Sequence, residues 1–110
     1  MIELFSINLK PGTRDQFHLL FSTQSFPLQI KWKISVIAFG PSLHDESSYY
    51  VIRSFASLAD RQKKEDDFYE SDDWKNGPRT AMLACIENYA TVVISEEMLG
   101  SWLATIKQPE

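Results

Sequence analysis

The chain has 110 residues, 44% of them apolar, and a net charge of −4 from 11 Lys and Arg against 15 Asp and Glu. This length predicts one globular domain, residues 1–110, with a single thin core. The basic residues are scattered and form no stripe interleaved with aromatics, which argues against a nucleic-acid partner.

The cysteine and histidine content limits the chemistry further. The one cysteine, Cys85, excludes an intrachain disulfide framework and suits a reducing cytoplasm. Because it lies in the apolar run Ala81–Ile86, we interpret it as a buried thiol rather than a nucleophile. His18, His44 and Cys85 have no metal-ligand spacing, so we expect no metal site. No apolar segment approaches the ~18 residues of a membrane span, and we expect none.

The first elements follow from apolar periodicity and breaker residues. Ile2–Leu9 alternates loosely and predicts a strand that ends at Lys10-Pro11-Gly12. Thr13 is the predicted N-cap of a helix, with Gln16 completing a capping box. Pro27 must kink this helix or begin a new one, since proline lacks the amide donor.

The later elements are predicted in the same way. Ser57 is expected to cap a helix that runs to about Phe68, with Asp60 at its third position. We interpret the charged run Arg61–Asp67 as a solvated face of this helix. The other predicted elements are strands at Ile34–Phe39, Tyr49–Phe55 and Tyr89–Glu96, a short turn at Ser71–Trp74, a helix at Arg79–Glu87, and a C-terminal amphipathic piece with Met98, Leu99, Trp102 and Leu103.

The order β-α-β-β-α-(α)-β predicts a ferredoxin-like α+β fold, a four-stranded antiparallel sheet with helices on one face. The strands are apolar on both faces: Tyr49, Val51 and Phe55 point one way, and Tyr50 and Ile52 the other. Because the helices cover only one face, we expect a homodimer that packs sheet against sheet into a closed α/β barrel. The alternative is that the C-terminal piece folds back over the open face.

Four segments carry a family resemblance. They are LKPGTRD at Leu9–Asp15, AFGP at Ala38–Pro41, YVIRSFASL at Tyr50–Leu58 and FYESDDW at Phe68–Trp74. In these segments and their order, the chain resembles the NIPSNAP family, small proteins of the dimeric α/β-barrel superfamily. The resemblance implies the ferredoxin-like fold and the dimer that the strand pattern predicts separately.

The resemblance has one departure, in the first strand. Relatives commonly have Glu-Leu-Arg-Thr-Tyr there, whereas Phe5 and Ile7 replace the Arg and the Tyr in this chain. The resemblance implies no settled reaction. The wider superfamily includes cofactor-free monooxygenases, isomerases and haem-binding proteins, so the fold is a weak guide to function.

Arg53 is the first candidate site residue. It lies in the middle of a strand, on the same side as Tyr49, Val51 and Phe55, where an unpaired charge is costly to bury. Its functional interpretation is a binding group for a carboxylate or enolate oxygen of a ligand. The structural alternative is an ion pair with Glu3 or Glu65.

Two histidines are candidates for a general base. His44, followed by Asp45 in a loop, has the general-base interpretation and the alternative of a solvated turn in which Asp45 makes an Asx-type bond. His18 borders the apolar side of the first helix. Its alternative interpretations are a general base, a haem ligand or a residue at the boundary of the core.

Two aromatic residues complete the candidate site. Tyr69 and Trp74 either form the roof of a small-molecule pocket or close the end of the core. The favoured function is therefore binding of a hydrophobic or acidic small molecule between helices and sheet, with no cofactor expected.

Two other functions stay open. One is a cofactor-independent monooxygenase or isomerase, with His18 or His44 as base and Arg53 stabilising negative charge. This requires an imidazole within reach of the space beside Arg53. The other is a purely structural or interaction dimer, which a filled core would indicate, whereas ligand binding requires an enclosed cavity of about 300 Å³ or more.

Overall fold

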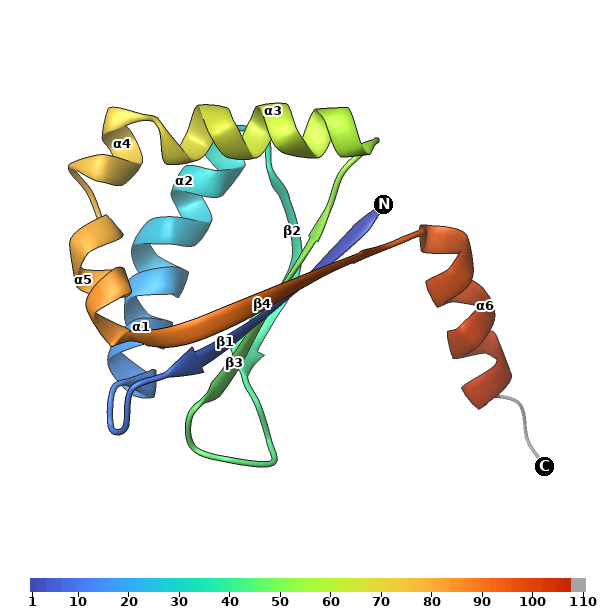
Figure 1. Ribbon diagram of the computed structural model, residues 1–110, viewed down its shortest axis with the longest axis horizontal. Coiled ribbons are helices and arrows are strands. Elements are labelled where there is room, and N and C mark those ends of the chain that lie inside the picture. Colours follow the sequence, from blue (N-terminus) through green and yellow to red (C-terminus); the bar gives the residue numbers. More distant parts are fainter. Residues whose placement is uncertain (108–110) are drawn as a thin grey trace.

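The computed structural model describes the backbone of residues 1–107 and the side chains of residues 1–101. Its strands form one antiparallel sheet in the order β2-β3-β1-β4, with the helices on one face (Figure 1). The ferredoxin-like prediction is confirmed. The strands are β1 (Ile2–Leu9), β2 (Ser35–Pro41), β3 (Ser48–Ser54) and β4 (Ile86–Ile94). The helices are α1 (Arg14–Leu20), the π-helical turn η1 (Phe21–Ser25), α2 (Phe26–Lys31), α3 (Leu58–Tyr69), α4 (Asp72–Lys75), α5 (Arg79–Cys85) and α6 (Glu96–Lys107).

The boundaries of β2 and β3 differ from their predictions by one or two residues, and the start of β4 differs most. β4 begins at Ile86, three residues before the predicted start at Tyr89, so α5 ends at Cys85 instead of Glu87. The backbone amide of Lys10 donates to the carbonyl of Cys85 at 2.7 Å, and Leu9 pairs with Ile86 in the sheet. Pairing with the end of β1 therefore ends the helix at Cys85 and puts the backbone in the extended conformation from Ile86 onward. Local helix propensity does not predict this change.

The predicted helix caps have different outcomes. The Ser57 side chain accepts a hydrogen bond from the amide of Asp60 at 3.0 Å, so the α3 cap is confirmed. The capping box at Thr13 is wrong, because Thr13 makes no side-chain cap bond. Its hydroxyl donates instead to the carbonyls of Lys10 and Cys85, at 2.7 and 3.3 Å, and so joins the end of β1 to the end of α5.

The helix after β1 changes form before Pro27, as predicted. The α-helical turns of α1 pass into the π-turn η1, and α2 begins at Phe26 with Pro27 in its first turn. The missing amide donor of proline is harmless there. The break places two polar side chains, Ser25 and Gln29, in the interior next to the sheet.

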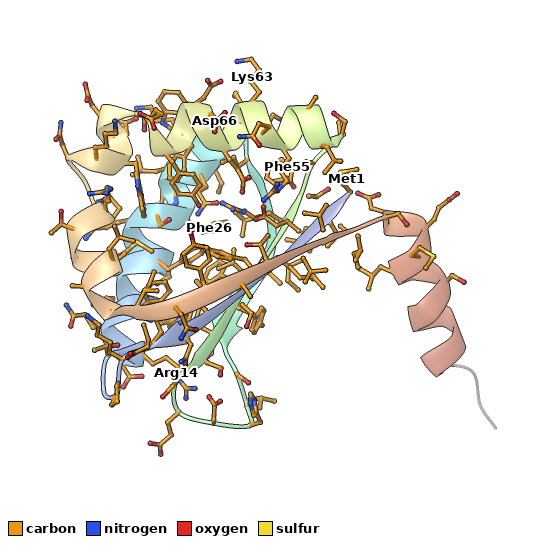
Figure 2. All side chains as sticks on the ribbon, in the orientation of Figure 1. Met1, Arg14, Phe26, Phe55, Lys63 and Asp66 are labelled. Carbon is orange, nitrogen blue, oxygen red and sulfur yellow. The ribbon has the colours of Figure 1, made fainter. Side chains whose placement is uncertain are left out.

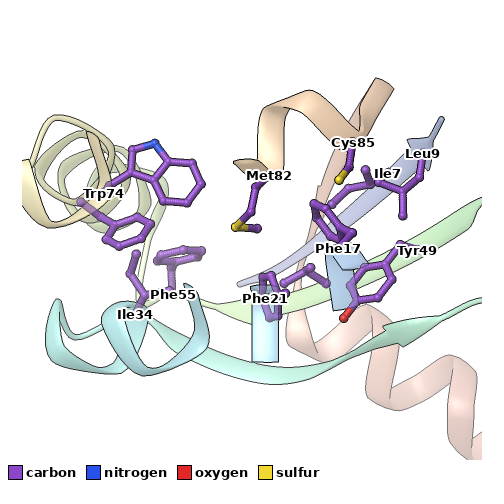
Figure 3. Packing of buried hydrophobic residues seen from close by; sticks show 12 residues of the cluster. Ile7, Leu9, Phe17, Phe21, Ile34, Tyr49, Phe55, Trp74, Met82 and Cys85 are labelled. Carbon is purple, nitrogen blue, oxygen red and sulfur yellow. The ribbon is translucent and has the colours of Figure 1, made fainter. Parts of the chain in front are cut away.

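The core lies between the helices and the sheet face that carries the odd-numbered residues of β1 and β3. Figure 3 shows Trp74 and Met82 from the helical layer packed over this face, with Phe17 and Phe21 below them. Aromatic rings dominate it, including a Phe17–Tyr49 edge contact at 5.0 Å between ring centroids. The buried apolar residues of the cluster are Ile7, Leu9, Phe17, Phe21, Ile34, Tyr49, Val51, Phe55, Phe68, Trp74, Met82 and Cys85.

The opposite face of the sheet has no helix over it in the described chain. In β4, Tyr89 and Val92 point to opposite faces and are 63% and 55% exposed. Tyr50 of β3 is 40% exposed on the open face. α6 follows the end of β4 and stands apart from the sheet (Figure 1), so α6 does not fold back over the open face. None of the described helices is long and apolar enough to cross a membrane.

Candidate functional site

A cavity of about 480 Å³ lies between the sheet and the helices α3 and α5. The buried part of its wall is mainly aromatic and aliphatic, with Phe17, Phe21, Val51, Trp74 and Met82. The exposed part, which we name the cavity mouth, consists of Gln62 and Asp66 of α3, Arg79 and Leu83 of α5, and Tyr89 and Thr91 of β4. The cavity therefore has an apolar interior and an opening beside the uncovered strand β4.

A cluster of polar side chains crosses the interior at one end of the cavity. We name this set the polar cluster. Its members come from β1, α2, β3 and α3 and are Glu3, Gln29, Arg53, Arg61, Glu65 and Tyr69.

Arg53 is the centre of the polar cluster, and only 3% of it is exposed. Its Nε and Nη2 lie 2.7 and 2.6 Å from the same oxygen of Glu3, and Nη2 also lies 2.6 Å from Oε1 of Glu65. Its Nη1 donates to Gln29 Oε1 at 3.1 Å and to the Tyr69 hydroxyl at 2.9 Å. These contacts engage all three nitrogens of the guanidinium, so the structural alternative is confirmed with both glutamates, and partners within the protein occupy Arg53.

Arg61 holds the other side of the glutamate pair. Its Nε donates to Oε2 of Glu3 at 2.6 Å and lies 3.2 Å from Oε2 of Glu65. Burial raises the pKa of Glu3, but the hydrogen bond with Glu65 and the charges of Arg53 and Arg61 outweigh burial and bring the pKa below its ordinary value. Glu3 is thus the carboxylate of the cluster whose ionised form the protein favours.

Glu65 behaves differently from Glu3, although both contact the same arginines. Burial and the neighbouring Glu3 carboxylate raise the pKa of Glu65 to about 7, against the lowering effect of Arg53 and Arg61. Glu65 lines the cavity, whereas Glu3 lies below the lining. The cavity wall therefore carries one carboxyl group that exchanges its proton near neutral pH.

The two predicted histidines lie away from the cavity. His18 is half-buried on α1, and its Nδ1 lies 2.6 Å from the hydroxyl of Tyr49. His44 is exposed in the β2–β3 loop, with Nδ1 2.6 Å from the Ser42 hydroxyl and Nε2 3.1 Å from Asp45. Neither imidazole lines the space beside Arg53.

Asp45 has the local role that the alternative for this loop predicts. Its Oδ1 accepts hydrogen bonds from the amides of Ser47 and Ser48 at 3.0 and 2.7 Å, an Asx-type turn. Arg14 of α1 also donates to backbone carbonyls at this end of the molecule (Figure 2). The loop is thus built by its own side chains and one arginine.

Tyr69 and Trp74 have both of the roles predicted for them, as part of a pocket wall and as the end of the core. Each lines the cavity, and Trp74 also packs on Phe68 at 5.5 Å between ring centroids. The Tyr69 ring lies 5.8 Å from the Arg53 guanidinium carbon, and its hydroxyl accepts from Arg53. The two rings therefore close the core and form part of the cavity wall together.

The charged run Arg61–Asp67 is only partly a solvated face. Lys63 and Asp67 form an exposed ion pair at 2.7 Å, and Figure 2 shows Lys63 pointing away from the sheet. Arg61 and Glu65, also four residues apart, instead point into the polar cluster. Their four-residue spacing places them on one helix face and could have predicted the pair. Lys63 and Asp67 have the same spacing, so the sequence does not show which pair points inward.

Two further predictions concern metal and thiol chemistry. Cys85 is a buried free thiol, as interpreted from its apolar surroundings. In the described part of the chain, no group of three or more His, Cys, Asp or Glu side chains is placed to hold a metal ion.

Solved structures with the same fold include NIPSNAP proteins, as the sequence resemblance indicates. A NIPSNAP family protein from Agrobacterium tumefaciens is similar with a TM-score of 0.77 at 15% identity, over 86% of this chain and 92% of that one. An uncharacterized NIPSNAP domain protein from Burkholderia xenovorans has a TM-score of 0.74 at 8% identity, over 86% and 94%. At these identities the likeness establishes the fold.

A third solved structure belongs to a differently described group. It is a protein from Caulobacter crescentus, provisionally described as an antibiotic biosynthesis monooxygenase, with a TM-score of 0.64 at 15% identity, over 86% of this chain and 89% of that one. No protein-family model matches the chain, and no curated protein matches it. The Burkholderia xenovorans protein is described as uncharacterized, and another Agrobacterium tumefaciens NIPSNAP protein as having unknown function.

The buried ion pairs of Arg53 with Glu3 and Glu65 lead to a prediction about the stability of the fold. Replacing Arg53 by Met leaves Glu3 and Glu65 buried without their main partner, so we expect the free energy of unfolding to fall by about 3–5 kcal/mol. Urea denaturation at pH 7 measures it. The matched control is Lys63→Met, which removes an exposed ion pair and is expected to change nothing measurable. An Arg53→Met protein as stable as its parent would contradict the importance of this cluster.

Glu65 makes a prediction about pH. The folded carboxyl keeps its proton up to about pH 7, whereas the unfolded one releases it near 4.5. Between these values the folded protein binds more protons, so this group makes the free energy of unfolding fall as pH rises. We expect Glu65→Gln to remove that fall in urea denaturation across this range, and Asp66→Asn to keep it. The same pH profile for Glu65→Gln and its parent would refute the raised pKa.

Proposed function

We propose that this chain is a NIPSNAP-like domain that binds a small hydrophobic or acidic molecule in the cavity between its helices and its sheet. The observation that carries the proposal is the cavity of about 480 Å³. Small-molecule sites are typically apolar hollows of about 300–1,000 Å³ with a few polar groups that orient the ligand. The aromatic interior and the polar cluster at one end match this description.

The two alternatives have less support. A purely structural role would be expected if the core were filled, and the presence of the cavity argues against this role. A cofactor-free monooxygenase or isomerase is suggested by the description of the Caulobacter crescentus protein. That reaction class was predicted here with His18 or His44 as the base, and neither lines the cavity. The cavity therefore supports binding over catalysis by these two residues.

We also propose that the protein works as a homodimer, in which a second copy packs against the open face of the sheet. Leu4, Ile52 and Val92, which lie side by side on neighbouring strands, give this face an apolar centre, and the described part of α6 leaves it open. A soluble protein rarely leaves such a face uncovered, and a two-fold axis lets the same patch cover itself. The buried free thiol fits a reducing compartment, which supports the cytoplasm as the location.

Ligand binding is tested by mass spectrometry of the intact protein taken directly from cells. We expect a bound small molecule on the parent protein and its loss from Met82→Trp, because the larger side chain fills the cavity. The matched control is Leu43→Trp, at a fully exposed loop position, which is expected to keep the ligand. Circular dichroism checks that both variants fold. A parent protein that carries nothing in cells and binds no apolar probe would overturn the proposal.

Dimerisation is tested by sedimentation at micromolar concentration. We expect the parent to sediment at twice the chain mass of 12.7 kDa. Ile52→Asp places a charge in the centre of the open face, and we expect it to sediment as a monomer. Lys63→Glu, on the side of α3 that points away from the sheet (Figure 2), is the control and should stay dimeric. A monomeric parent would contradict the dimer.

A further inference from the structure

The polar cluster is electrically balanced when both of its carboxyl groups are ionised. Glu3 and Glu65 then supply two negative charges, and Arg53 and Arg61 supply two positive charges. Glu3 and Arg53 are 1% and 3% exposed, so any imbalance at this depth is poorly screened by water. An anion that enters the cavity would add a third negative charge to this balanced set.

The two arginines differ in what they offer to a ligand. All three guanidinium nitrogens of Arg53 are engaged by residues of the protein. Arg61 also lines the cavity, and the hydrogen bond that it donates to Glu3 comes from Nε. Its two Nη groups make no hydrogen bond with a described residue, and such paired donors bind a carboxylate. Arg79, at the cavity mouth, makes no hydrogen bond or ion pair with the described residues and adds a second positive charge there.

The titratable groups that face Glu65 come from every element around it. Glu3 of β1 is ionised because its pKa is lowered, and Arg53 of β3 and Arg61 of α3 are cationic. Burial raises the pKa of Tyr69, which leaves its hydroxyl neutral. Across the cavity mouth, α3 itself presents Asp66 and α5 presents Arg79, and α2 adds only the neutral Gln29. Glu65 is thus the member that can change charge near neutral pH.

We propose that the cavity binds an apolar monocarboxylate through the Nη groups of Arg61, and that Glu65 takes up one proton as the anion enters. This rests on the proposed function, because it names the class of ligand and the group that adjusts to it. With Glu65 protonated, the two arginines are balanced by Glu3 and the ligand carboxylate. The proton that Glu65 gains comes from solvent and returns to solvent when the ligand leaves.

The physical reason for the uptake is repulsion between like charges. A ligand carboxylate beside Arg61 lies near Glu65, which already shares its arginines with Glu3. A second neighbouring anion favours the neutral form of a carboxyl group. Glu65 starts with a pKa of about 7, so little further change is needed to protonate it throughout the neutral range. The aromatic wall then receives the apolar body of the ligand.

The test uses two probes of the same shape, 2-naphthoate and the uncharged 2-naphthyl methyl ketone. Isothermal titration calorimetry is performed between pH 6 and pH 9, in buffers of different ionisation enthalpy, which count the protons exchanged. Above pH 7 we expect the Kd for naphthoate to rise about tenfold per pH unit and proton uptake to approach one. The Kd for the ketone is expected to be independent of pH.

Variants separate the roles of the two side chains. Glu65→Gln imitates the protonated carboxyl, so we expect naphthoate to bind it without proton uptake and with a Kd that is constant with pH. Asp67→Asn, at an exposed carboxylate of α3 that pairs with Lys63 and does not line the cavity, is the matched control and should keep the pH dependence of the parent. Arg61→Met is expected to weaken naphthoate by tenfold or more and to leave the ketone unaffected.

The outcomes distinguish this inference from the proposed function. If naphthoate binds the parent with no proton uptake, or only the ketone binds, the inference is wrong and the binding function stands. If neither probe binds any folded variant or the parent, and no ligand is found on protein from cells, the proposed function itself fails. Because the proton count uses the parent protein, it does not depend on whether a variant folds.

Discussion

The buried guanidinium of Arg53 is the interaction on which the arrangement of this protein depends. It bonds Glu3 on the neighbouring strand β1 and Glu65 on α3, and it also reaches Gln29 on α2. Burying these charges is costly, and each is accepted only because the others pair with it. The cluster therefore fixes both helices relative to the sheet, at one position and in one register. Among the described residues, no buried side-chain nitrogen or oxygen lacks a hydrogen-bond partner.

The same cluster explains why a hollow exists beside it. Polar side chains of the cluster fill the space between α3 and the sheet. Glu65 and Tyr69 are the members at its boundary with the cavity. Beyond them the wall consists of aromatic rings around a space that extends to β4, an edge strand with both faces uncovered. Phe5 and Ile7 line that space and contribute to its apolar wall. The result is a hydrophobic cavity with ionisable groups at one end.

Sequence periodicity predicted the fold because its signals are local. Alternation along β1 and β3 placed Arg53 on the helix side and Ile52 on the open side, and the structure agrees. Pro27 and Ser57 predicted a helix break and a helix start, both within a turn of where they occur. Thr13 misled the prediction, because its hydroxyl bonds Cys85, which is 72 residues away. The start of β4 failed for the same kind of reason, since contact with β1 determines it.

The sequence by itself determined the order of the elements, the face to which each strand residue points, and the need for Arg53 to find a partner. These features depend on backbone preferences and on the two-residue period of a strand. Both are determined by residues close together in the sequence. Only the tertiary structure decided that Arg53 has two glutamate partners, that Arg61 and Glu65 turn inward, and that His18 and His44 lie elsewhere. Arg53 and Arg61 reach Glu3 across 50 and 58 residues of chain, and burial of the whole set gives Glu65 its altered pKa. Desolvation and pairing belong to the assembled interior, so no local pattern carries them.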